Sequence, residues 1–320
     1  MNTMDMNKTS KVDGVKKNLV KQARKAAAKK YFAQFKSPFV ILMFIWLAVI
    51  CFTYLYGIYW GLITSLKDIL NFNDDIFGWP RKLMFSNYTT AFKHLYVTIE
   101  AGAGTRRVMF PELLFNSITY AVVMPCVTVF SQMLVAYAAS KYHFRFNKVL
   151  HFCVVLSIVV PPIGSLGMSL QIARTLGIYD NFLMYAITSI GFANSGFLIW
   201  YGVFNGISSE YMDAAKIDGA GHFRILITIM LPLARVPIMI LWVLAFIGSW
   251  NTYSVQYTML PSMPNLSLAL WYFQFDLGNE ISWPPMQIAA SMITALPCLV
   301  LYFTFQKWFV GNLTSGGLKG

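Results

Sequence analysis

One polar segment, between two long apolar runs, holds the residues whose types and spacing indicate a function. It extends from Glu210 to Pro232 and includes Asp213 and Gly219. Carboxylates suit the positive end of a helix, and glycine readily takes the left-handed conformation that ends one. We therefore predict a short helix, a sharp turn and a second helix that Pro232 interrupts. Such a pair indicates binding of a partner protein; an ordinary interfacial loop is the alternative.

The residues around this turn support the same interpretation. Ser208 and Ser209 can accept amide hydrogen bonds at the start of the first helix. Ala214 and Ala215 are small, so the surface of another protein can approach the backbone closely. The second helix is expected at 222–230.

The composition indicates a membrane protein. Hydrophobic residues make up 57% of the chain and charged residues only 12%, against about a quarter in soluble domains. A membrane span takes about 20 mostly apolar residues and must be helical, because lipid offers no partner for backbone polar groups. We therefore predict an all-α integral membrane protein. Its six transmembrane helices are expected at about Phe39–Thr64, Leu114–Ala138, Val149–Ile172, Phe182–Phe204, Leu226–Trp250 and Gln287–Phe309.

The basic residues predict how the chain is oriented. Of the 25 Lys and Arg residues, 18 fall on the side of the termini and the polar segment, ten of them in the first 37 residues. The positive-inside rule then places both termini and the polar segment in the cytoplasm. We predict a basic cytoplasmic tail at 1–37 and one membrane domain at 38–320, with external loops at 65–113 and 251–286 and the helix pair at 208–231. The tail is expected to set the topology or to attract anionic lipid.

Several kinds of site are not indicated. The cysteines (Cys51, Cys126, Cys153 and Cys298) form no CxxC pair, and the four histidines have no metal-ligand spacing. The sequence contains no GxxxxGK[ST] loop, Ser/His/Asp triad or pair of carboxylates placed for catalysis. We therefore expect the chain to bind no metal, cofactor or nucleic acid and to catalyse no reaction.

The polar segment also resembles a known motif. Asp213-Ala214-Ala215, three residues, Gly219, nine residues and Ile229-x-Leu231-Pro232 is similar to the EAA motif, EAA-x3-G-x9-I-x-LP, of binding-protein-dependent ABC importer permeases. Asp213 stands where the motif has Glu. The negative charge is kept, but the Asp side chain is one methylene shorter. The stretches that resemble the carbohydrate-uptake, maltose-type group are Asn116-Ser117, Ala136–Tyr142, Pro161-Pro162, Leu176–Asn181, Ser249–Asn251 and Gln306–Gly320. The basic tail and the region Lys93–Pro111, which looks inserted, match poorly.

The resemblance implies an ABC type I importer permease fold with cytoplasmic coupling helices, in the cytoplasmic membrane of a prokaryote. It implies a second, related permease subunit, an external solute-binding protein and two ATPase subunits, which would carry ATP and Mg. The residues it implies for ATPase coupling are Glu210, Asp213, Ala214, Ala215, Asp218, Gly219, Ile229, Leu231 and Pro232.

Aromatic residues recur at three- and four-residue steps on predicted spans four and five, where they form stripes. Aromatic rings stack on the apolar faces of sugars, and amide side chains supply hydrogen bonds. Packing between helices and contact with lipid is the alternative. The expected solute-path residues are Asn116, Tyr120, Asn194, Trp200, Tyr201, Phe246, Trp250, Asn251 and Tyr253.

Three other functions compete with a sugar importer subunit. The same architecture can move another solute, such as a peptide or a phosphodiester. A standalone secondary transporter or channel would require carboxylates inside the membrane, whereas Asp180, Asp276 and Glu280 fall in loops. A membrane enzyme would require a catalytic constellation, and the sequence indicates none.

Overall fold

The computed structural model describes residues 37–102, 104–142, 144–160, 165–191, 194–275 and 282–313. Outside them lie the basic tail up to residue 36, the Pro161-Pro162 pair, Asp276, Glu280 and residues 314–320. The chain divides after Ile63 into two units, each described by itself.

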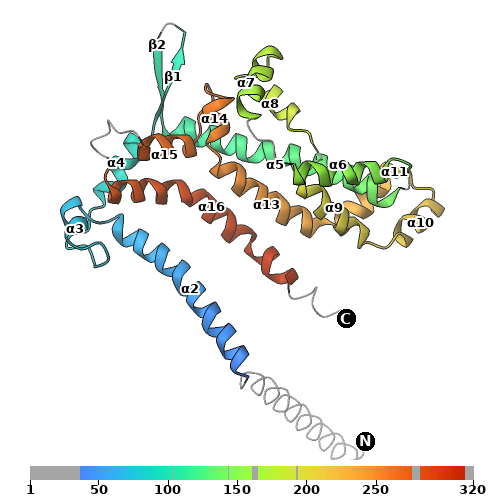
Figure 1. Ribbon diagram of the computed structural model, residues 1–320, viewed down its shortest axis with the longest axis horizontal. Coiled ribbons are helices and arrows are strands. Elements are labelled where there is room, and N and C mark those ends of the chain that lie inside the picture. Colours follow the sequence, from blue (N-terminus) through green and yellow to red (C-terminus); the bar gives the residue numbers. More distant parts are fainter. Residues whose placement is uncertain are drawn as a thin grey trace, which may run out of the picture. The chain divides into compact units, whose positions relative to one another are not determined.

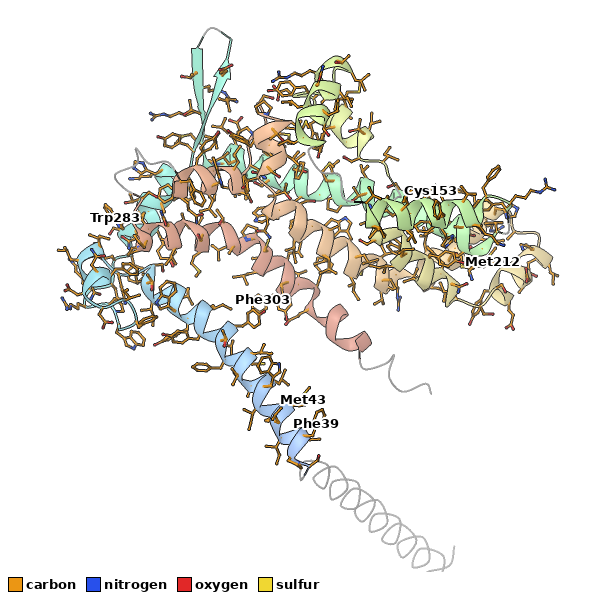
Figure 2. All side chains as sticks on the ribbon, in the orientation of Figure 1. Phe39, Met43, Cys153, Met212, Trp283 and Phe303 are labelled. Atoms are coloured by element: carbon orange, nitrogen blue, oxygen red, sulfur yellow. The ribbon has the colours of Figure 1, made fainter. Side chains whose placement is uncertain are left out.

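The first unit contains one described helix, α2 (Pro38–Thr64), which carries no charged residue. Its 27 residues correspond to a length of about 40 Å, enough to cross a bilayer core. Large apolar side chains such as Phe39 and Met43 are exposed along it (Figure 2). A helix that is apolar all round must face lipid or a protein core. The apolar span predicted at Phe39–Thr64 is confirmed as one continuous helix.

The second unit begins with a folded segment built around a buried lysine. Between α3 (Ile69–Asp74) and α4 (Ser86–His94) the chain turns back on itself. Lys67, which is fully buried, donates from Nζ to the carbonyls of Asp75 at 2.8 Å and Ile76 at 3.0 Å. These bonds hold the loop that follows α3.

The region that looked inserted is a β-hairpin. Strands β1 (Val97–Ala101) and β2 (Gly104–Val108) pair antiparallel, with Val97 opposite Val108. Both valines are buried, and Gly102 takes the left-handed conformation (φ 62°) in the connecting turn. The expectation of an all-helical chain is therefore wrong here, because the buried ends of this short hairpin anchor it to the helices below.

Two further helices are continuous and apolar enough to span a membrane. They are α5 (Phe110–Lys141) and α16 (Pro284–Leu313), which correspond to predicted spans two and six. Together with α2 they make three such helices in the described part of the chain, or four if one bent pair counts as a single span.

Predicted spans three and four are each divided in two. The first divides into α6 (Asn147–Val159) and α7 (Ser165–Thr175), and the second into α8 (Phe182–Thr188) and α9 (Ser195–Asn205). Val160, just before Pro161, is extended (φ −88°, ψ 102°), as expected because the proline ring disfavours helical geometry there. The side chain of Asn194 accepts a bond from the Gly196 amide at 2.9 Å and starts α9.

Predicted span five is bent. It comprises a π-helical segment η1 (Leu226–Met230), α12 (Leu231–Leu233) and α13 (Arg235–Asn251), and the short helix α11 (His222–Ile225) directly precedes it. The α11–α12 part and α13 differ in direction by 76°, with the break at Ala234. The predicted interruption at Pro232 thus lies two residues too early. Pro232 has no amide hydrogen and cannot donate to the preceding turn. The helix nevertheless continues past it, because the preceding turn widens to a π-helical pattern. In this pattern the Leu231 amide bonds to the Leu226 carbonyl, five residues earlier.

Helix α5 forms the centre of the second unit. It packs against α9 and α13, and α16 packs against α13 and α15 (Leu266–Phe275) (Figure 1). The contacts include fully buried small residues, such as Ala121 on α5 and Ala289 and Ala290 on α16. Small residues let helices approach closely, which is the main source of association between helices in lipid. The short helix α14 (Ser254–Thr258) joins α13 to the segment before α15.

We predict that Lys67→Met loosens the segment around α3. The change leaves two carbonyls without their buried donor, which costs about 1–3 kcal/mol. Hydrogen–deuterium exchange of the amides between 66 and 84 should become faster in the detergent-purified protein. Lys82→Met, at an exposed position, is the matched control. Equal exchange in both variants would contradict the structural role of Lys67.

Candidate coupling site and solute-path residues

The helix pair predicted from the EAA-like motif is present. Its first helix, α10, spans Glu210–Ile217 and has Glu210 and Asp213 in its first turn, where they suit the helix dipole. Ser208 Oγ accepts a bond from the Glu210 amide at 3.3 Å, whereas the side chain of Ser209 caps nothing. Asp213 and Lys216 form an exposed ion pair at 3.0 Å, a kind that contributes little to stability.

The turn after α10 requires Gly219. Its φ is +78°, and its amide bonds to the Lys216 carbonyl at 3.0 Å. The Ala220 amide bonds to the Ala215 carbonyl at 2.9 Å, which completes a Schellman motif. Among the described residues, no atom lies within 4 Å of the position that a Cβ of Gly219 would take, so the constraint comes from the backbone angle. The predicted left-handed turn is confirmed.

One face of α10 packs on the rest of the unit. Met212 (labelled in Figure 2) and Ala215 are buried, against a cluster that includes Phe204 on α9 and Ile225 on α11. Ala214 is exposed. The expectation that both alanines admit another protein is therefore wrong for Ala215, which is 8% exposed and faces the chain's own core.

Exposed apolar residues that sequence analysis missed lie on α10 and α11. The exposed fractions are 54% for Tyr211, 87% for Ile217 and 75% for Phe223. Three large exposed apolar side chains within 13 residues of sequence make this stretch a candidate contact surface. Asp218 is also exposed here. Helical spacing gave a signal for the exposure of Ile217. Met212 and Ala215 are three residues apart and share one helix face, whereas Ile217 falls on another face.

The last residues of the motif lie against the protein's own core. Ile229 and Leu231 pack against the same buried cluster as α10, and Pro232 is exposed beside the π-helical segment. The nine predicted coupling residues thus differ in burial. Ala215 is buried, Ile229 and Leu231 pack against the core, and the other six are exposed: Glu210, Asp213, Ala214, Asp218, Gly219 and Pro232.

Three of the predicted solute-path aromatics lie in the core of this chain. Trp200 is fully buried, Phe246 is 6% exposed and Trp250 is 2% exposed. The rings of Phe246 and Trp250 stack at 5.9 Å, and Trp250 Nε1 donates to the Thr294 carbonyl at 3.1 Å. All three rings are buried and pack on neighbouring aromatic rings, which favours the packing alternative for them.

The other six take separate places. Tyr120 is buried beside Phe182, and Tyr201 packs edge-on against His151 at 4.4 Å. Asn116 bonds to the Pro264 carbonyl, and Asn194 caps α9. Asn251 and Tyr253 are exposed, with Tyr253 stacked on Trp271 at 5.5 Å. None of the nine lines the cavity of about 460 Å³ between β1, the turn at Asp180 and the segment from α14 to α15.

Known proteins share this arrangement. The family described as binding-protein-dependent transport system inner membrane component matches residues 131–314, which include α10 and the helices after it. The maltodextrin transport system permease protein MdxG of Bacillus subtilis (strain 168) is 29% identical over 218 residues, 66% of this chain and 78% of that protein. The sn-glycerol-3-phosphate transport system permease protein UgpE of Yersinia enterocolitica is 27% identical over 226 residues, 69% of this chain and 80% of that protein.

A solved structure shares the fold. In the crystal structure of a bacterial ABC transporter that imports the polysaccharide alginate, one chain superposes with a TM-score of 0.66 at 24% identity. The match covers 85% of this chain and 96% of that one. With the helix pair at 210–233 and more than half of the sequence inside the matched region, the chain belongs to the inner membrane components of binding-protein-dependent transport systems, the permease subunits of ABC importers.

Proposed function

We propose that this chain is one of two permease subunits of an ATP-driven importer for a sugar or oligosaccharide. The observation that carries the proposal is α10, a short helix with one face packed on the core and an exposed opposite face that carries Ile217. In an importer permease such a face is available to an ATPase subunit that binds ATP and Mg. This chain supplies the membrane path and the contact.

The proposed topology has six spans with both termini in the cytoplasm. It counts α6 with α7, α8 with α9, and the bent α11–α13 segment each as one broken span. Broken helices are tolerated in a membrane where protein or a water-filled path surrounds them. The proposed domains remain the basic tail at 1–37 and the permease domain at 38–320, with 65–113 and 251–286 outside and 208–231 in the cytoplasm.

The proposed mechanism uses α10 as the point where the ATPase acts. ATP-driven closure of two ATPase subunits would move α10 and rock the permease pair between inward-facing and outward-facing states. Converting a two-state equilibrium from 1:99 to 99:1 takes about 5.5 kcal/mol of differential binding. A firmly seated helix can transmit this, and α10 is seated by Met212 and Ala215.

A sugar is the favoured solute because a maltodextrin permease is among the most similar relatives. The similar glycerol-3-phosphate permease makes a small phosphodiester or phosphomonoester the second candidate. An external binding protein would deliver either, and it is expected to select the solute.

We expect transport to require the complete assembly. Proteoliposomes with both permeases, the ATPase and the binding protein should import the solute only with ATP inside and the binding protein outside. The solute is identified by the rise in Tm of the binding protein, with maltotriose and sn-glycerol 3-phosphate as probes. Import by this chain alone would refute the proposal and favour a secondary transporter.

We predict that Gly219→Asp weakens ATPase binding. A side chain at φ +78° is strained by about 1–2 kcal/mol, which corresponds to roughly five- to thirtyfold weaker docking of α10. Co-purification of the ATPase with the permease pair measures the loss. Gly221→Asp is the matched control: it adds the same charge at a negative φ, where Asp is a good N-cap. An undiminished yield with Gly219→Asp would count against the turn's role.

We also predict that Ile217→Ser and Phe223→Ser weaken the same contact from the exposed face. Each change removes apolar area that the ATPase would bury, and truncation of a contact residue typically costs more than 1 kcal/mol at a hot spot. The affinity of the purified ATPase for nanodisc-embedded permease should fall about fivefold or more, with the Tm of the permease unchanged. Leu83→Ser, exposed in the α3–α4 segment, should leave affinity unchanged. Equal affinities for all three variants would show that this face is not the contact.

A further inference from the structure

The C-terminal end of α5 holds the coupling segment, residues 208–221, at both sides. Lys141 Nζ donates to the carbonyl of Ile207, just before this segment. Tyr142 Oη shares a hydrogen bond of 2.9 Å with His222 Nδ1, just after it, and the two rings meet edge-on at 5.3 Å. Two consecutive residues thus fix the entry and the exit of the segment.

This end of α5 is itself held in place. Asn147 Nδ2 donates to the carbonyls of Ala139 at 2.9 Å and Tyr142 at 3.2 Å. The ring of Tyr137 packs edge-on against Tyr142 at 5.9 Å and against Phe204 at 5.4 Å. The two holding residues therefore move with α5 and do not swing freely.

The other end of α5 holds an external segment in a similar way. Asn116 Nδ2 donates to the Pro264 carbonyl at 2.9 Å, and Ser117 Oγ accepts from the Leu266 amide at 2.8 Å. Both side chains are buried. Asn265 Nδ2 donates in turn to the Thr252 carbonyl at 2.8 Å. This bond joins the end of the segment 252–266 to its beginning.

We propose that α5 mechanically couples the coupling segment to the external segment 252–266, so that it acts as a connecting rod between them. Lys141 and Tyr142 would act as positioning residues at the coupling end, and Asn116 and Ser117 at the external end. The helix is continuous between them, over roughly 37 Å at 1.5 Å per residue. Hydrogen bonds are short and directional, so a displacement of the coupling segment displaces α5 and, through it, the external segment. The proposal rests on the proposed function, in which the ATPase contacts α10 and the binding protein lies outside.

Contact between two segments does not show that a change in one affects the other. The experiments therefore measure how events at one end of α5 change the behaviour at its other end. Tyr142→Phe removes one oxygen and keeps the ring, and Lys141→Met keeps the length of the side chain and removes the donor. In the full complex in nanodiscs, each should lower the ratio of binding-protein-stimulated to unstimulated ATP hydrolysis about fivefold, the factor expected for one lost hydrogen bond. Tyr54→Phe on α2 and Lys148→Met on α6, both exposed, are the matched controls and should retain the wild-type ratio.

A second measurement separates transmission from local support. In the wild-type complex, a nonhydrolysable ATP analogue should change hydrogen–deuterium exchange both at 208–222 and at 252–266. In Tyr142→Phe and Lys141→Met, the change at 252–266 should disappear. A purely local role would alter exchange at 208–222 and leave the distant response intact, which would overturn the proposal.

The remaining outcomes are also distinct. If the wild-type complex shows no stimulation by the binding protein, the proposed function fails. If the wild type is stimulated and both variants match it, the connecting rod fails and the proposed function stands. If Lys141→Met does not assemble, Tyr142→Phe alone decides, since the loss of one partly exposed hydroxyl leaves the packing of α5 in place.

Discussion

Close packing of α5 against α9 and α13 forms the largest helix contacts of the larger unit and holds its centre together. Alanines at 121, 136 and 139 are buried at these contacts. In lipid there is little hydrophobic gain from bringing apolar helices together, so small residues and close backbone approach must supply the association. A bulky side chain at such a position would separate the helices that carry both the coupling segment and the external segment.

The EAA-like motif combines two tasks in one short stretch. Gly219 and the residues from Ile229 to Pro232 give the pair its shape, through a left-handed turn and a helix widened before proline. Exposed apolar residues on the two helices remain available to a partner: Tyr211 and Ile217 on α10 and Phe223 on α11. A residue's presence in the motif therefore does not imply contact with the ATPase; Ala215 is inside the chain's own core.

Several polar side chains within the membrane domain fasten one segment to another. Asn116, Ser117 and Trp250 each bond to backbone groups of another element. An unpaired polar group is costly in a low-dielectric interior, so these bonds are specific as well as stabilising. They explain why residues of a type that suits sugar recognition can serve the architecture instead.

The sequence by itself determined the features that depend on local chemistry. The apolar run at Phe39–Thr64 is long enough to cross a bilayer in one helix, and Gly219 permits a turn that other residues resist. Only the tertiary structure decided which face of α10 is exposed, that Lys93–Pro111 contains a hairpin, and that the bend falls at Ala234. These outcomes depend on packing between residues far apart in the chain, such as the buried cluster that contains both Met212 and Met133 on α5, and helical or strand periodicity alone does not specify them.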